Sequence, residues 1–319
     1  YKNMQNPIIR LLIIYINLFV CLGFYKSQNL YSKDYGNKKN PAIIFIHGGP
    51  SGNSTLFEST TAENLSKLGF YVIVYDRRGE GRSIDKFAKF TFKESNEDLL
   101  YILKKYKIKK ANILAHSFGG IVATMFTNKY PDKVNSLILA DALINQQEIY
   151  NHILSEGKAF FSKDFSKLKQ IEAIESLNKN SADYRKQCFE LASEMNFFRM
   201  PKETQESILL RENYEKSDFF KNNIRNQEAP IQFYLNEPQN NIDIKPFLKN
   251  IKIRKIPIYG IYGNDDNIFP KTQLQDLTKI IGESNVKNVE NCSHYLFVDQ
   301  QSTFLNFIKS KINLARFLK

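Results

Sequence analysis

Five short runs of apolar, strand-forming residues dominate the chain, and glycine or a polar residue ends each of them. The runs are residues 42–49, 70–76, 111–117, 135–141 and 256–263. They are apolar at nearly every position rather than at every second one, which is typical of strands covered on both faces in a parallel sheet. Stretches with helical periodicity separate the first four runs. This alternation predicts an α/β fold with right-handed crossovers.

The alternation is interrupted by a long segment in which the pattern is helical only. Within it, Ile171 and Ile174 are two of several apolar residues that recur at helical spacing. We therefore predict a core formed by residues 40–145 and 246–319, with residues 146–245 inserted as a helical cap, or lid, over the sheet. The 319 residues are enough for one sizeable core with such an insertion.

The charge balance is strongly basic, with a formal net charge of +12. Such a balance fits nucleic acid, a membrane surface or an acidic ligand as partner. However, the basic residues do not form one tract, and the densest run, residues 104–110, closes a predicted helix, where lysines complement the helix dipole. The sequence holds no zinc-finger spacing, Walker A loop or aromatic RNA-binding signature. We therefore expect solvated basic side chains and no nucleic-acid partner.

Cysteines are few, and no two of them form a C-x-x-C pair. They are Cys21, Cys188 and Cys292. A cysteine metal site is therefore not expected. For Cys188 and Cys292 the sequence leaves two alternatives open, free thiols or one disulfide in an oxidising compartment.

The first 23 residues have the organisation of a secretory signal peptide. A basic start with Lys2 and Arg10 precedes an apolar stretch, residues 11–22, and small residues follow near Gly23. The stretch is short for a membrane span, which needs about 20 residues. We expect residues 1–23 to be a signal peptide of a secreted or periplasmic protein. The alternatives are an uncleaved anchor that attaches the protein to a membrane, and a buried helix.

Ser117 stands where the strand run meets a helical stretch, among small residues. Ala115, Gly119 and Gly120 leave room for a tight strand-to-helix turn that lifts the serine above the sheet. A nucleophilic serine also needs a base that takes its proton, an acid that orients the base, and N–H donors for the oxyanion.

Candidates for the base and the acid follow later in the chain. His294 lies in a polar loop after the last strand-like stretch, and we predict that it is the base. Asp265 and Asp266 follow the run that ends at residue 263, where they can reach a loop histidine. The order Ser, Asp, His is then complete, and Asp141 is the reserve acid.

Two backbone N–H groups are predicted to form the oxyanion hole. One belongs to Phe118, directly after the serine and at the start of a helix, where free amides and the helix dipole favour negative charge. The other belongs to Gly49, in the glycine loop after the first strand run. His47 and His116 adjoin these positions in the chain, and we expect them to pack behind the site.

Four motifs in this order resemble the α/β-hydrolase fold family. They are the elbow G-x-S-x-G at 115–119, with alanine for the first glycine; the oxyanion loop HGGP at 47–50; the turn DRRGEGRS at 76–83; and the acid loop GNDDNIFP at 263–270. The spacing from glycine to proline in the family's acid loop selects Asp266 over Asp265. The resemblance implies a mostly parallel central sheet flanked by helices. It also implies a triad of Ser117, Asp266 and His294 that needs no metal or organic cofactor.

Within this family, HGGPSG and DRRGEGRS are similar to the proline iminopeptidases and their relatives, which remove N-terminal residues from peptides and carry a helical cap at the same place. The resemblance implies that cap glutamates bind the substrate's amino group, and Phe189-Glu190 matches the aromatic-Glu part of that cap motif. The alternative for Glu190 is an ordinary surface charge. Ser51 interrupts the family's usual HGGPG, and Phe118 stands where tryptophan is usual, so strict proline specificity is not implied.

The sequence therefore predicts a serine hydrolase that cleaves an ester or amide bond of a small molecule or short peptide through an acyl-enzyme. An aminopeptidase similar to the proline iminopeptidases is the first expectation. A carboxylesterase or lipase keeps the chemistry and changes the substrate. A transferase or lyase on the same fold, and a non-catalytic binding protein on a hydrolase scaffold, are the alternatives of other classes.

Overall fold

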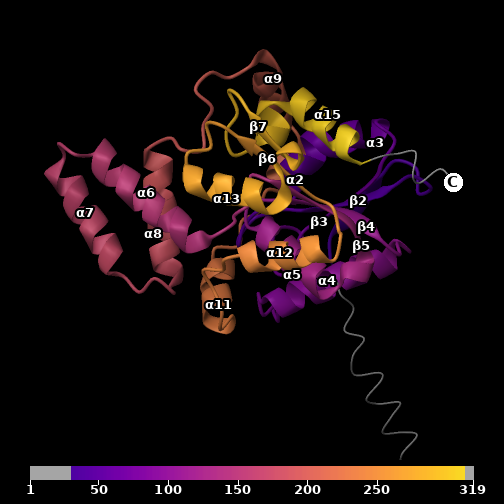
Figure 1. The fold of residues 1–319 in the computed structure, drawn as a ribbon, viewed down its shortest axis with the longest axis horizontal. Helices are drawn as coiled ribbons and strands as arrows, with labels where there is room; N and C mark the ends of the chain where they lie inside the picture. Colours follow the sequence, from indigo (N-terminus) through magenta and orange to yellow (C-terminus); the bar gives the residue numbers. More distant parts are fainter. Residues whose placement is uncertain (1–29, 313–319) are drawn as a thin grey trace, which may run out of the picture.

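A single mixed sheet forms the centre of the molecule (Figure 1). The computed structural model describes residues 30–312, and the predicted leader, residues 1–23, lies outside the described residues. In the described part of the chain the sheet has seven strands in the order β1-β3-β2-β4-β5-β6-β7. They are β1 (Ser32–Tyr35), β2 (Ala42–Ile46), β3 (Tyr71–Tyr75), β4 (Ala111–His116), β5 (Val134–Ala140), β6 (Ile258–Gly263) and β7 (Val286–Val289). β1 runs antiparallel to β3, and the other neighbours pair in parallel.

The central strands are buried on both faces, as the continuous apolar runs predict. Every residue of β2, β3 and β4 is buried. Along β2, Ile43 and Phe45 pack in one core layer, and Ile44 and Ile46 pack in the layer on the opposite face. The predicted α/β fold with a mostly parallel sheet is confirmed, and the polar stretch before β2 supplies the edge strand β1.

Helices cover both faces of the sheet. The core helices are α2 (Thr55–Phe57), a π-helical turn (Glu58–Ala62), α3 (Glu63–Lys67), α4 (Phe92–Lys105), α5 (Gly119–Lys129), α12 (Lys245–Ile253), α13 (Lys271–Ile281), α14 (Leu296–Asp299) and α15 (Gln301–Lys311), with 3-10 turns at Pro131–Lys133 and Glu283–Asn285. Apolar residues of α4, α5, α12 and α13 share one core cluster, and those of α2, α3, α14 and α15 share the other. Figure 1 shows α4, α5 and α12 on one side of the strands and α3 and α15 on the other.

A capping side chain precedes helix α4. The helix begins at Phe92, and the Thr91 side chain accepts a hydrogen bond from the Glu94 N–H. The Glu94 carboxylate in turn accepts hydrogen bonds from the N–H groups of Lys89 and Phe90, and so fixes the segment that precedes the helix.

Between β5 and the core helix α12 the chain forms six helices. They are α6 (Gln146–Phe160), α7 (Phe165–Ser176), α8 (Ala182–Glu194), α9 (Gln205–Glu215), α10 (Asp218–Lys221) and α11 (Glu228–Asn236), which we call the inserted helices. α6, α7 and α8 stand together at one end of the sheet (Figure 1). They pack through Ile153, Ile171, Ile174 and Leu191, all of them buried. Within residues 30–312, none of the helices has the length and apolar character that crossing a membrane requires.

Candidate active site

Ser117 occupies a strained turn between β4 and α5. Its φ angle is +53°, in the left-handed region that non-glycine residues rarely adopt. A Cβ atom at Gly119 would lie 2.5 Å from the Ile46 carbonyl oxygen, so glycine is needed for α5 to start this close to β2. The small residues around the serine therefore have the role that the sequence predicts, which is to permit a sharp turn at the end of the strand.

The turn lies where the strand order reverses. β2 pairs with β3 on one side and with β4 on the other, so the connections that leave β2 and β4 diverge and open a crevice at the carboxyl ends of the strands. A Cβ atom at Gly48 would lie 3.5 Å from Ser117 Oγ, which places the loop after β2 directly beside the serine. Among the described residues, the N–H groups of Gly49 and Phe118 have no hydrogen-bond acceptor. Two free amides are thus available near Ser117.

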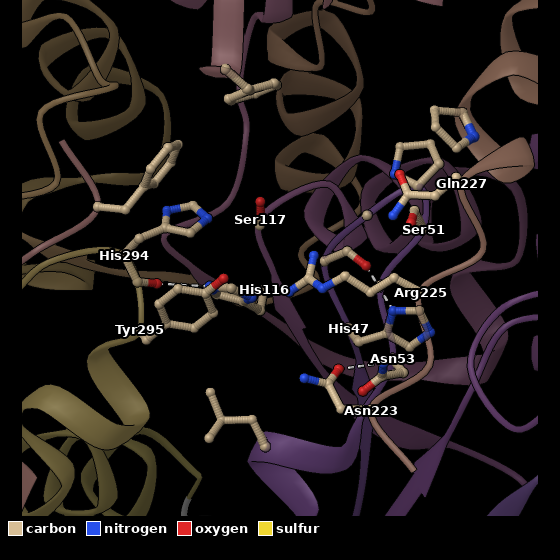
Figure 2. Close-up of a pocket in the computed structure, with 18 of the residues that line it drawn as sticks. His47, Ser51, Asn53, His116, Ser117, Asn223, Arg225, Gln227, His294 and Tyr295 are labelled. Carbon is tan, nitrogen blue, oxygen red and sulfur yellow. Dashed lines mark hydrogen bonds between the residues drawn. The ribbon is translucent and has the colours of Figure 1, made fainter. Parts of the chain in front are cut away.

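His294 and Asp266 are brought together from separate loops. His294 follows β7 and Asp266 follows β6, and His294 Nδ1 lies 2.6 Å from Asp266 Oδ2. Both residues are buried. Burial raises the pKa of Asp266, and the His294 imidazole and the N–H of Ile268 oppose that rise. His294 and Ser117 line the same cavity, and Figure 2 shows both side chains among the residues around it. In the described structure no hydrogen bond joins these two side chains.

The other two candidate acids contact different groups. Asp141 Oδ1 accepts a hydrogen bond of 2.8 Å from the Gly263 N–H, and its Oδ2 is buried without a partner among the described residues. Burial, followed by the charge of Asp266, raises the pKa of Asp141 well above its usual range. Asp265 accepts from the Cys292 N–H at 3.2 Å and so fastens the loop that carries His294. Of these three carboxylates, Asp266 is the one hydrogen-bonded to the imidazole.

His47 and His116 hold loops of the site through hydrogen bonds. The His116 ring nitrogen Nε2 lies 2.7 Å from the His294 carbonyl oxygen, and burial, with the nearby His294, lowers the pKa of His116 to about 3. A neutral ring that donates from Nε2 satisfies this contact. His47 Nδ1 lies 2.7 Å from the Gly48 carbonyl oxygen, and its Nε2 accepts from the Arg77 N–H at 3.0 Å.

The charged residues of the turn after β3 are engaged with protein groups. Asp76 is fully buried and accepts from Arg82 and from the N–H and hydroxyl of Ser54. Arg78 forms an ion pair with Asp98. These contacts hold the turn after β3 in place. Arg77 is the residue of the turn that sequence reasoning missed.

A cavity of about 860 Å³ opens in front of Ser117 and His294. Its aromatic walls include Phe189 of helix α8, Phe198 in the connection between α8 and α9, and Tyr295 in the core loop after β7. Glu190 lines this cavity, but its side chain is 59% exposed and lies 3.8 Å from Lys186 on the same helix. The structure therefore places Glu190 at the edge of the site without a buried carboxylate pocket around it.

Two further expectations concern metals and thiols. Within residues 30–312, no group of three or more His, Cys, Asp or Glu side chains is arranged to hold a metal ion. Cys188 and Cys292 are both buried free thiols. The alternative of a disulfide between them is not found, because they lie in different parts of the core, Cys188 in α8 and Cys292 in the loop after β7.

Comparison with known proteins agrees with this architecture. The family model of the alpha/beta hydrolase fold matches residues 41–301. The proline iminopeptidase of Saccharolobus solfataricus is 27% identical over 89% of this chain and 89% of its own, and that of Lactobacillus acidophilus is 23% identical over 86% and 90%. Among solved structures, a proline iminopeptidase-related protein from Thermus thermophilus matches with a TM-score of 0.63 and 23% identity, over 88% of this chain and 92% of its own.

Esterases share the same architecture. A Nitrososphaera gargenis structure from a study of carboxylesterases matches with a TM-score of 0.59 and 17% identity, over 92% of this chain and 97% of its own, a likeness that shows the fold alone. The relatives thus include the iminopeptidases to which the sequence motifs point. Since the family model spans most of the sequence, the chain belongs to the alpha/beta hydrolase fold family of enzymes.

Proposed function

We propose that the chain is a serine hydrolase in which Ser117 forms an acyl-enzyme. The observation that carries this proposal is the buried pair of His294 and Asp266, which faces the same cavity as a serine on a strained strand-to-helix turn. Ser117 Oγ forms a bond to the substrate carbonyl carbon while His294 Nε2 takes the hydroxyl proton. Asp266 keeps the imidazole in the required tautomer and supports its positive charge.

The second half of the reaction uses the same groups. His294 gives its proton to the departing amine or alcohol as the carbon–heteroatom bond breaks, and then takes a proton from the water that attacks the acyl-enzyme. The oxyanion of both tetrahedral intermediates is bound by the N–H groups of Gly49 and Phe118. Each such donor typically contributes about 10²–10³ in rate. The inserted helices act as a cap that excludes water and selects the substrate.

For the substrate, we propose an aminopeptidase that releases N-terminal residues from short peptides. Two proline iminopeptidases match nearly the full chain, and Glu190 lines the cavity, where it can bind a substrate amino group. A specific observation favours an esterase as second candidate. Glu190 is exposed and its charge is shared with Lys186, whereas Phe189 and Phe198 give the cavity aromatic walls that suit an acyl chain.

Parallel kinetics on two substrate types separate these candidates. The aminopeptidase is supported if Glu190→Gln hydrolyses a prolyl anilide much more slowly than wild type does, and hydrolyses a short-chain nitrophenyl ester at the wild-type rate. Turnover of the ester alone supports the esterase. Ser117→Ala must abolish both activities, and a protein that turns over neither type favours the non-catalytic alternative.

A further inference from the structure

Gly49 lies between two guanidinium groups, one from the core and one from the inserted helices. The Gly48 carbonyl shares a peptide bond with the Gly49 N–H, and it accepts a hydrogen bond from Arg77 Nη2 at 2.8 Å. The carbonyl of Gly49 itself accepts from Arg185 Nη2 at 2.9 Å. Both peptide groups of the predicted oxyanion donor are therefore fixed by arginines.

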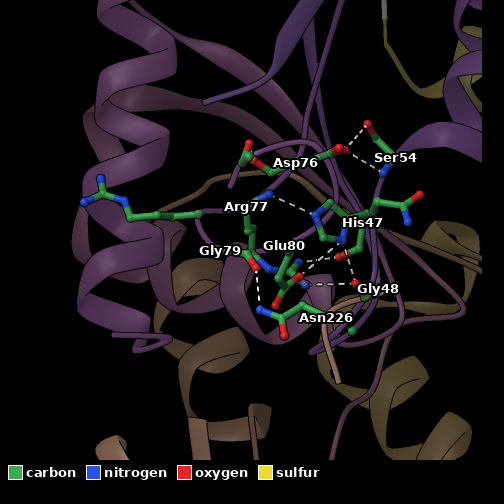
Figure 3. Close-up of polar contacts among 12 residues, drawn as sticks. His47, Gly48, Ser54, Asp76, Arg77, Gly79, Glu80 and Asn226 are labelled. Carbon is green, nitrogen blue, oxygen red and sulfur yellow. Dashed lines mark hydrogen bonds and ion pairs between the residues drawn. The ribbon is translucent and has the colours of Figure 1, made fainter. Parts of the chain in front are cut away.

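Arg77 is held in the core by a compact set of contacts. It is 3% exposed, forms an ion pair of 2.7 Å with the buried Glu80, and also donates to the His47 carbonyl. Figure 3 shows Arg77, Glu80 and His47 gathered around Gly48. The Arg77 guanidinium also lies 5.5 Å from the centre of the Phe118 ring. One buried arginine thus contacts the residues on both sides of the proposed oxyanion hole.

The direction of the Gly48 carbonyl determines where the Gly49 N–H points. The peptide between these residues is trans, so its C=O and N–H point in opposite directions. Because Arg77 and His47 draw the carbonyl oxygen toward the core, the N–H is turned toward the crevice in which Ser117 stands. Two donors on one carbonyl, one of them charged, also polarise the peptide and strengthen its N–H as a donor.

Arg185 supplies the second support from helix α8. Among the described residues it has no carboxylate within ion-pair distance, and its Nε is buried without a partner. Its guanidinium packs 5.1 Å from the Phe189 ring, which leaves the bond to Gly49 as its polar contact in the described structure. A cation placed in this way, beside the loop of the site and without a counter-ion, indicates a role at that loop rather than in a surface ion pair.

We propose that Arg77 and Arg185 are positioning residues of the oxyanion hole: Arg77 aims and polarises the Gly49 N–H from the core, and Arg185 ties the same residue to the inserted helices. The proposal rests on the proposed function, since it takes Gly49 to be an oxyanion donor. If the proposal holds, the oxyanion hole is complete only while helix α8 contacts the loop after β2.

The test measures how fast a fluorophosphonate labels the full-length chain, together with kcat and KM for a nitrophenyl ester. Arg185→Gln should slow labelling and lower kcat by about 10-fold with KM unchanged, less than the 10²–10³ typical for loss of a donor itself. Arg185→Lys should recover part of the rate. The double variant Arg77→Gln with Glu80→Gln, which keeps the core neutral, should lower both rates by about 10- to 100-fold.

Arg254→Gln is the matched control, because Arg254 also donates to a backbone carbonyl, that of Asn128, at 2.8 Å, but does not line the cavity. It should label at the wild-type rate. The proposal is overturned if Arg185→Gln labels as fast as wild type, if it changes KM alone, or if Arg254→Gln slows labelling equally. If the double variant does not fold, the labelling rates of the Arg185 variants still test the proposal. A wild-type chain that never labels overturns the proposed function first, and this inference with it.

Discussion

His294 Nδ1 and Asp266 Oδ2 lie 2.6 Å apart although 28 positions separate the two residues in the chain. The parallel pairing of β6 with β7 accounts for this contact. Because Gly263 and Val289 lie side by side at the carboxyl ends of these strands, the loops that follow them start at the same edge of the sheet. The pair is therefore a product of sheet topology, and its chemistry can be tested residue by residue.

Asp266→Asn should remove catalysis and leave the fold intact. The amide keeps the shape of the carboxylate but stabilises the wrong imidazole tautomer, so we expect kcat to fall by about 10⁴. Steady-state kinetics on the responsive substrate measure the effect, with circular dichroism as the check on folding. Asp141→Asn is the matched control, since Asp141 contacts Gly263 and not the imidazole. A variant at 266 with nearly full activity, or equal losses in both variants, contradicts the assignment.

Asp141→Asn should change how stability depends on pH. Folding raises the pKa of the Asp141 carboxyl above its value of about 4 in the unfolded chain. The free energy of unfolding therefore decreases as the pH rises from about 4 to the folded-state pKa. Asparagine cannot ionise, yet its oxygen can still accept from the Gly263 N–H. The unfolding free energy of the variant, minus that of wild type, should therefore increase with pH when both are measured by urea denaturation. A difference that decreases with pH would contradict a raised pKa at Asp141.

His116→Gln should make the protein less sensitive to acid. Burial holds the pKa of His116 at about 3, against 6.5 in an unfolded chain, so the unfolded state binds the proton first. The ring's contribution to stability is then present above about pH 6.5 and is lost as pH falls toward 3. Each such histidine adds about 1.4 kcal/mol per pH unit to the slope of unfolding free energy in that window. Denaturant titrations at several pH values should show a shallower slope in the variant; identical slopes would contradict a neutral buried ring.

Asp76→Ala should destabilise the core without touching the reacting groups. It removes the acceptor for Ser54 and Arg82 and leaves buried donors without a partner, a change that typically costs about 3–5 kcal/mol. Asp218→Ala is the matched control, because Asp218 pairs with Lys221 on the exposed surface. Urea midpoints measure both. A loss no larger in Asp76→Ala than in the control would mean that the turn does not depend on this carboxylate.

The sheet and the turn at Ser117 could be predicted because both leave local signals in the sequence, whereas the choice of Asp266 over Asp265 came from the family resemblance. Continuous apolar runs mark strands buried on both faces, and small residues mark the turn at the serine. The position of Glu190 could not be foreseen, because helical periodicity does not fix how a cap helix is turned over a cavity. The role of Arg77 was also hidden, since the carbonyls of His47 and Gly48 become its partners only once β2 and β3 lie side by side.

The most direct measurement is covalent labelling of the full-length chain by a fluorophosphonate, with the modified residue located by mass spectrometry. We predict one label per chain, on Ser117, that is absent in Ser117→Ala and forms much more slowly in His294→Ala. Wild-type protein that stays unlabelled, or a label on another residue, would contradict the claim that Ser117 is activated by His294 and Asp266.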